Sequence, residues 1–230
     1  MARIGIASAT AALALALGFA APSLAHTHTK AHCSSAAPHR GTRSYRQSHC
    51  PKGHAPHHKG KPSHALFFTA HNGHCPDARM RPSATNAAQI RAATLCLVNR
   101  ERAAHGEHAL HWNADLLSAA QAHTQSMVVN GYFAHIGRSG DTSLQRIRHS
   151  GYIYSRHLGF EVAENIGWGS LWLGSPRAIV AAWMVSPGHR ANILDGRLRD
   201  TGIGVSPHLG SLAPGQSGGI YTQDFGVLIG

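Results

Sequence analysis

Apolar residues recur at helical spacing in the second half of the chain, and glycines separate the periodic stretches. From Thr85 to Ala104 the apolar positions fall on one face, charged residues lie on the other, and Gly106 is placed to end the helix. A second helix is predicted between the capping stretch 111–115 and Gly131. Its expected apolar face consists of Leu117, Ala120, Thr124, Met127 and Val128.

Three shorter helices follow. The first is expected around Leu144–Arg148, capped by Asp141 or Thr142 and ended by Gly151. Ser175 followed by Pro176 is a start signal for the next helix. Ser186 with Pro187 repeats this signal before a helix that carries His189.

Strand character is concentrated in three segments, 161–167, 201–206 and 220–229, where β-branched and aromatic residues alternate with glycine and polar residues. Helices and strands are interleaved without regular βαβ units, which disfavours a doubly wound parallel sheet. The pattern therefore predicts one α+β domain over residues 85–230.

The first 25 residues have the organisation of a secretory signal peptide. Arg3 precedes an apolar run, and Pro22 and the small residues Ser23 and Ala25 follow it. The alternative is a membrane anchor, but the run barely reaches the ~20 residues that a span requires. We expect cleavage, export to the extracellular space and no membrane span in the mature protein.

Positive charge is concentrated in a leader predicted over residues 26–84. Residues 26–76 contain seven Lys or Arg, no acid and eleven of the twenty histidines. With few apolar residues, this leader is expected to stay disordered. It is either a solvated spacer or a segment that binds anionic cell-wall polymers or lipid headgroups by charge. Nucleic acid is not an expected partner, because no recognition motif is present.

Four cysteines remain after cleavage, an even number in an exported chain: Cys33, Cys50, Cys75 and Cys96. Disulfides form in that compartment. Parity alone permits three pairings. We predict Cys33 with Cys50 and Cys75 with Cys96, and the second bond would tie the entry segment to the first helix.

Four motifs occur together in the second half of the chain. They are Gly131–His135 (GYFAH), Ala163–Ile166 (AENI), Trp183–Leu194 (WMVSPGHRANIL) and Tyr221–Gly226 (YTQDFG). In order and spacing they resemble the bacterial, SCP-like extracellular type of CAP domain, which cysteine-rich secretory proteins, antigen 5 and pathogenesis-related 1 proteins share. The resemblance covers roughly residues 85–229. It implies a three-layer α-β-α sandwich around a small, mainly antiparallel sheet.

The resemblance also nominates His135, Glu164 and His189 as neighbours in one ligand-binding cleft. Two imidazoles and a carboxylate are good ligands for a divalent metal such as zinc. The family's familiar tetrad has a second Glu, and no Glu follows Glu164 in this chain. The alternative is that these residues make only hydrogen bonds that support the fold.

The sequence gives little support for catalysis by a serine nucleophile. Ser186, His189 and Asp195 can be written as a triad, but Ser186 is better explained as a helix cap bound to a backbone amide. We therefore expect a binding module rather than an enzyme, acting on a hydrophobic small molecule, such as a lipid, or on a cell-envelope component. The rival hypothesis is a metal-dependent hydrolase that uses the same cleft. The apolar segment 168–173 is expected to form a glycine-flanked loop with exposed side chains.

Overall fold

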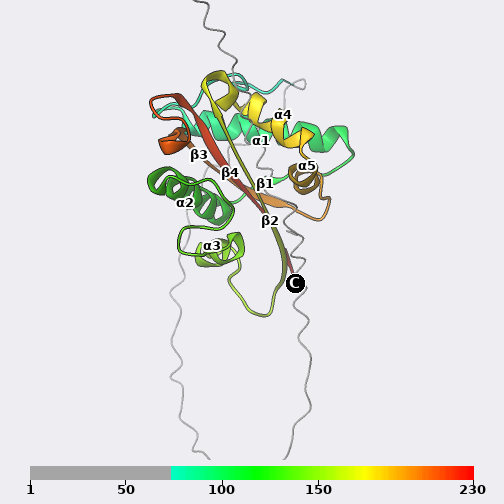
Figure 1. Ribbon diagram of the computed structural model, residues 1–230. Helices are drawn as coiled ribbons and strands as arrows, with labels where there is room; N and C mark the ends of the chain where they lie inside the picture. Colours follow the sequence, from blue (N-terminus) through cyan, green and yellow to red (C-terminus); the bar gives the residue numbers. More distant parts are fainter. Residues whose placement is uncertain (1–73) are drawn as a thin grey trace, which may run out of the picture. The chain divides into compact units, whose positions relative to one another are not determined.

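The computed structural model describes residues 74–230, and Figure 1 shows the arrangement of their helices and strands. The predicted signal peptide, most of the leader and the Cys33–Cys50 pair lie outside the described residues. The α-helices are α1 (Ala87–Ala104), α2 (Ala114–Asn130), α3 (Ser143–His149), α4 (Pro176–Val185) and α5 (Pro187–Ile193). The strands are β1 (His111–Trp112), β2 (Gly159–Ser170), β3 (Asp200–His208) and β4 (Ser217–Ile229). Two short 3-10 helices are η1 (Leu171–Gly174) and η2 (Gly210–Leu212).

The four strands form one sheet in the order β1-β3-β4-β2. β4 pairs antiparallel with both β2 and β3, and the short β1 pairs parallel with β3. Helices α2 and α3 cover one face, while α1, α4 and α5 cover the other (Figure 1). The predicted three-layer sandwich with a mainly antiparallel sheet is confirmed.

The larger hydrophobic core lies between the sheet and the helices α1 and α4. Trp183 of α4 is buried against Tyr221 of β4, with the two rings edge to face, and Phe225 is fully buried nearby. The indole Nε1 of Trp183 donates to the carbonyl of Ile166 at 3.0 Å. A buried indole N–H needs such an acceptor, so this bond fixes α4 against strand β2.

Helix α2 packs on the opposite face at unusually short range because β3 has glycines there. A Cβ added to Gly202 would lie 2.0 Å from the Leu117 nitrogen, and one added to Gly204 would lie 2.4 Å from the Ala120 oxygen. Only glycine permits this approach of helix backbone to strand backbone. The glycines of β3 thus set the position of α2, and the turn that contains His135 follows this helix.

Some local predictions were wrong. Leu116, not Leu117, occupies the core from α2, and Leu117 is only half-buried. The helix caps at Ser175 and Ser186 are in the predicted positions, but neither side chain bonds a backbone amide there. The segment 168–173 is not a loop: strand β2 runs to Ser170 and η1 follows directly.

The predicted Cys75–Cys96 disulfide is confirmed. The Cα atoms are 5.7 Å apart and the bond spans 21 positions of sequence. Cys75 is buried in the core beside α1, so the bond holds the segment before α1 against that helix.

Candidate functional site

Glu164 lies in β2, the strand at one edge of the sheet. Strand register pairs it with Asp224 of β4, and both side chains are buried. Directly paired residues project on the same face of a sheet, so two carboxyl groups meet beneath the helices of that face. A buried carboxylate requires partners, and Glu164 receives them from two other segments.

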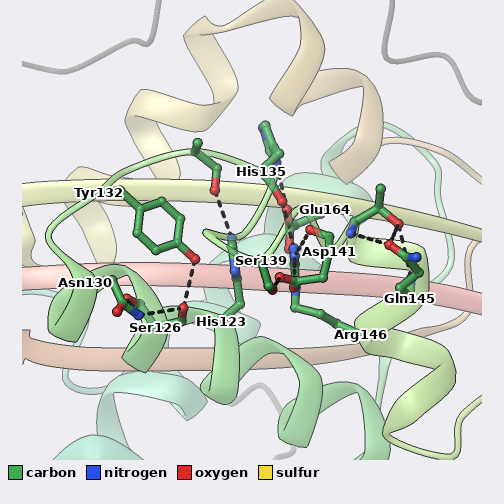
Figure 2. Close-up of polar contacts among 12 residues, drawn as sticks. His123, Ser126, Asn130, Tyr132, His135, Ser139, Asp141, Gln145, Arg146 and Glu164 are labelled. Carbon is green, nitrogen blue, oxygen red and sulfur yellow. Dashed lines mark hydrogen bonds and ion pairs between the residues drawn. The ribbon is translucent and has the colours of Figure 1, made fainter.

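The first partner of Glu164 is His135, from the turn that follows α2. Gly131 ends α2 in the left-handed conformation, with φ 62°, which is an ordinary helix ending for glycine. The turn is held to α2 by His123, whose Nε2 bonds the carbonyl of Ala134 at 3.0 Å. His135 Nδ1 lies 2.8 Å from Glu164 Oε1 (Figure 2).

The second partner is Arg146 of α3. Its Nη2 donates to Glu164 Oε2 at 2.6 Å and to the carbonyl of His135 at 3.0 Å. Its Nη1 donates to Asp141, at 3.0 Å to both the carbonyl and Oδ2. A single guanidinium therefore joins β2, the turn after α2 and the start of α3, as Figure 2 shows.

Helix α3 is placed by local chemistry. Thr142 caps it, and Gln145 completes the reciprocal capping box. Of the two predicted caps, Thr142 is the correct one. Asp141 is thereby free to pair with Arg146 and to accept a hydrogen bond from Ser139.

The pKa values of the two buried carboxyl groups are shifted in opposite directions. Burial raises the pKa of Glu164, but the hydrogen bond from His135 and the charge of Arg146 outweigh it, so the net shift is downward. Burial and then the charge of Glu164 raise the pKa of Asp224 well above its ordinary value. These shifts favour the ionised form of Glu164 and the protonated form of Asp224.

His189 lies in α5, which packs against strand β2. Its Nδ1 is 2.9 Å from Ser186 Oγ. Desolvation, and then the charge of His135, lower the pKa of His189 to about 4. The structure therefore brings His135 and Glu164 into direct contact. His189 does not contact either of them, but it lies within range of the electrostatic effect of His135. His189 is a neutral imidazole at physiological pH.

Two asparagines connect α5 to the edge strand. Asn192 Nδ2 donates to the carbonyl of Glu164 at 3.2 Å and to Asn165 Oδ1 at 2.9 Å. Asn165 Nδ2 in turn donates to the carbonyl of His189 at 3.1 Å. These bonds bind α5 to the residue that carries the carboxylate.

The Ser-His-Asp arrangement is not assembled. Ser186 does contact His189, contrary to its expected role as a backbone cap. Asp195, however, accepts hydrogen bonds from Arg197 through both oxygens and is not a partner of His189. An imidazole with a pKa of about 4 is also a weak general base at neutral pH.

The fit of a metal ion can be judged from the donor atoms. Both oxygens of Glu164 already accept strong bonds, from His135 and from Arg146. Within residues 74–230 no group of three or more His, Cys, Asp or Glu side chains is arranged to hold a metal. The guanidinium of Arg146 supplies the positive charge at Glu164 that a cation would otherwise provide. As arranged here, His135, Glu164 and His189 do not fit a shared ion.

Several members of this network had no signal of their own in the sequence. Arg146 is one of many arginines, and nothing in the spacing of α3 distinguishes it. His123 is buried on the core face of α2, and desolvation lowers its pKa. Asp224 had a weak signal, because it is an acid inside a strand that is otherwise apolar or neutral.

Residues 95–225 match the CAP family, described as the cysteine-rich secretory protein family. This match covers more than half of the 230 residues, so the chain belongs to that family.

Two proteins of Bacillus subtilis (strain 168) are similar in sequence. The uncharacterized protein YkwD is 30% identical over 144 residues, which are 63% of this chain and 49% of YkwD. The uncharacterized membrane protein YlbC is 30% identical over 112 residues, which are 48% of this chain and 30% of YlbC. The chain thus spans about half the length of YkwD and less of YlbC.

Two solved structures are also similar. One is an extracellular protein containing an SCP domain from Bacillus anthracis str. Ames, with TM-score 0.48 and 25% identity, covering 63% of this chain and 43% of that one. The other is an outer surface protein from Borrelia burgdorferi, with TM-score 0.49 and 17% identity, covering 64% of this chain and 96% of that one. Among residues 74–230, no helix is both long and apolar enough to cross a bilayer.

Proposed function

We propose that this protein is a secreted or surface-located binding module, and that its ligand contacts the rim formed by His135 and His189 beside strand β2. The observation that carries this proposal is the state of Glu164. Its carboxylate is buried and neutralised by Arg146, and it holds His135 in one orientation while half of the His135 side chain stays exposed. In this proposal, the role of Glu164 is to orient His135, and His135 contacts the ligand.

The two imidazoles of the rim have free ring nitrogens, and exposed apolar residues lie near them in sequence. Nδ1 of each imidazole is engaged, by Glu164 in His135 and by Ser186 in His189, which leaves Nε2 of each ring for a ligand. Ile136, next to His135 in sequence, is 51% exposed, and Val185, next to Ser186, is 73% exposed. A hydrophobic molecule with a small polar group, or a cell-envelope component of that kind, matches this chemistry.

The rival function is metal-dependent hydrolysis at the same residues. It requires an ion held by the cleft or an activated nucleophile. The occupied oxygens of Glu164 and the low pKa of His189 favour binding over that chemistry. The Cys75–Cys96 bond supports the extracellular location, because disulfides persist in oxidising compartments.

The test is to export the full chain from a bacterial host, purify it without a nickel column, and measure both metal content and extractable small molecules by mass spectrometry. We expect a bound apolar molecule in the wild type, its loss from the His135→Ala/His189→Ala variant, and less than one equivalent of metal. The matched control is His149→Ala, which replaces an exposed histidine of α3. Stoichiometric zinc with ester hydrolysis that disappears in the double variant would instead establish the hydrolase.

A further inference from the structure

The turn between β2 and α4 presents two large apolar side chains to solvent. Leu171 is 48% exposed and Trp172 is 66% exposed. Leu171 also has φ 52°, a left-handed conformation that a residue with a large side chain adopts at a cost. The exposed indole and the strained backbone add no stability to the folded domain by themselves. Contact with a partner would explain why both are present.

The backbone beneath these side chains is tightly held. Ser175 N donates to the carbonyl of Trp172 at 3.1 Å, and the buried hydroxyl of Tyr221 donates to the carbonyl of Gly174 at 2.7 Å. A Cβ added to Gly174 would lie 2.4 Å from the nitrogen of Gly219. The turn is therefore seated on the end of the sheet, and the two apolar side chains project from a rigid base.

Basic residues lie at the same end of the domain. Arg177, in the first turn of α4, donates its backbone N–H to the carbonyl of Ala78 at 2.8 Å, which brings the segment before α1 against the start of α4. Figure 1 shows that segment beside the turn that precedes α4. Arg79, Arg81 and Arg177 are exposed, and Asp77 is the only acid in the stretches 74–86 and 171–178.

The remainder of the chain joins the domain at this same segment. Residues 26–73 contain seven Lys or Arg and no Asp or Glu. They are connected through His74 to Cys75, which the disulfide fixes to α1. In sequence, the leader thus directly precedes the segment 74–86 that carries Arg79 and Arg81.

We propose that this end of the domain docks on an anionic lipid bilayer, with Leu171 and Trp172 entering the interface and Arg79, Arg81 and Arg177 contacting headgroups. Tryptophan favours the boundary between headgroups and acyl chains. Stable attachment at a membrane surface takes two signals, and an apolar insertion plus a polybasic segment is one such combination. An anionic polysaccharide explains the charges but leaves Leu171 without a contact.

The test is co-sedimentation of the full mature chain with vesicles of phosphatidylglycerol and phosphatidylcholine, compared with vesicles of phosphatidylcholine alone. We expect binding only to the anionic vesicles, weakened by high salt. Trp172→Ala should lower the partition coefficient about tenfold, and Leu171→Ala several-fold, because each variant removes buried apolar area. Tyr154→Ala is the matched control, since Tyr154 is 74% exposed elsewhere on the surface and should leave binding unchanged.

Insertion can be followed directly with brominated lipids, which quench only tryptophans that enter the bilayer. Quenching should occur in the wild type and vanish in Trp172→Phe, which keeps an apolar side chain and so should still bind. Binding that Trp172→Ala and Leu171→Ala leave unaltered would overturn the proposal and assign attachment to the leader alone. Attachment to isolated cell-wall polymer without vesicle binding would also overturn it.

Discussion

The contact between Arg146 and Glu164 should dominate the energetics of the candidate site. Both side chains are buried, with 9% and 2% of their surfaces exposed, and the Nη2–Oε2 distance is 2.6 Å. Removing one partner of a buried pair leaves the other charge uncompensated, which costs about 3–5 kcal/mol. Because Arg146 still pairs with Asp141, we expect Glu164→Ala to lower the free energy of unfolding by an amount near the lower end of that range.

A double-mutant cycle separates the interaction from these burial costs. At an effective dielectric constant of ~20, two unit charges ~4 Å apart attract by about 4 kcal/mol. Arg146 keeps Asp141 as a partner when Glu164 is removed, so the measured coupling should be smaller. We expect about 2–3 kcal/mol, near the upper end for residues in direct contact.

The other pairs should couple less, in an order that the geometry predicts. His135 contacts Glu164 but is half exposed, so their coupling should be about 0.5–1 kcal/mol. Glu164 and His189 make no direct contact and should add within a few tenths of a kcal/mol. The exposed pair Arg197–Glu161, at 3.0 Å, is the matched control and should couple by less than about 1 kcal/mol.

The assay is equilibrium unfolding in urea at neutral pH with the disulfide intact, using single and double variants of each pair. Equal slopes with respect to urea are required for the comparison. Additive effects of Glu164→Ala and Arg146→Ala, or a coupling no larger than that of the Arg197–Glu161 control, would refute the view that one guanidinium organises the site.

Three further predictions follow from burial and close packing. Because burial and the charge of Glu164 raise the pKa of Asp224 in the native state, the wild type should lose stability as pH rises above about 4; Asp224→Asn should remove that loss, and an unfolding difference between the two proteins that is the same at about pH 4 and about pH 7 would contradict this. The lowered pKa of His189 should appear as an NMR titration midpoint of about 4, with stability lost as pH falls from ~6.5 through that value, whereas a midpoint near ~6.5 would show a solvated ring. Gly204→Ala places a Cβ 2.4 Å from α2 backbone and should cost about 1–3 kcal/mol in denaturant unfolding, while Gly188→Ala, which meets nothing within 4 Å, should not.

The order of helices and strands was readable because local patterns reflect local physics. Apolar periodicity located α1 and α2, the Ser-Pro pairs located the starts of α4 and α5, and alternation located the three long strands. Strand ends and the two-residue β1 were not readable, because strand length depends on the partner strand and not on the segment itself. Leu116, and not the predicted Leu117, lies in the core, because the rotation of α2 is set by its contact with the glycines of β3, a segment distant in sequence.

The candidate site was only partly predictable. The motifs correctly placed His135 against Glu164, which lie 29 positions apart in sequence. No local pattern could show that Arg146 would occupy the second oxygen of Glu164, or that Asp224 would lie opposite it, since both contacts are created by sheet register and by the packing of α3. The sequence by itself determined which side chains were available, and the tertiary structure decided which charged side chains lie next to one another. The reason is that a carboxylate's role depends on its burial and its nearest cation, and both are properties of the folded chain.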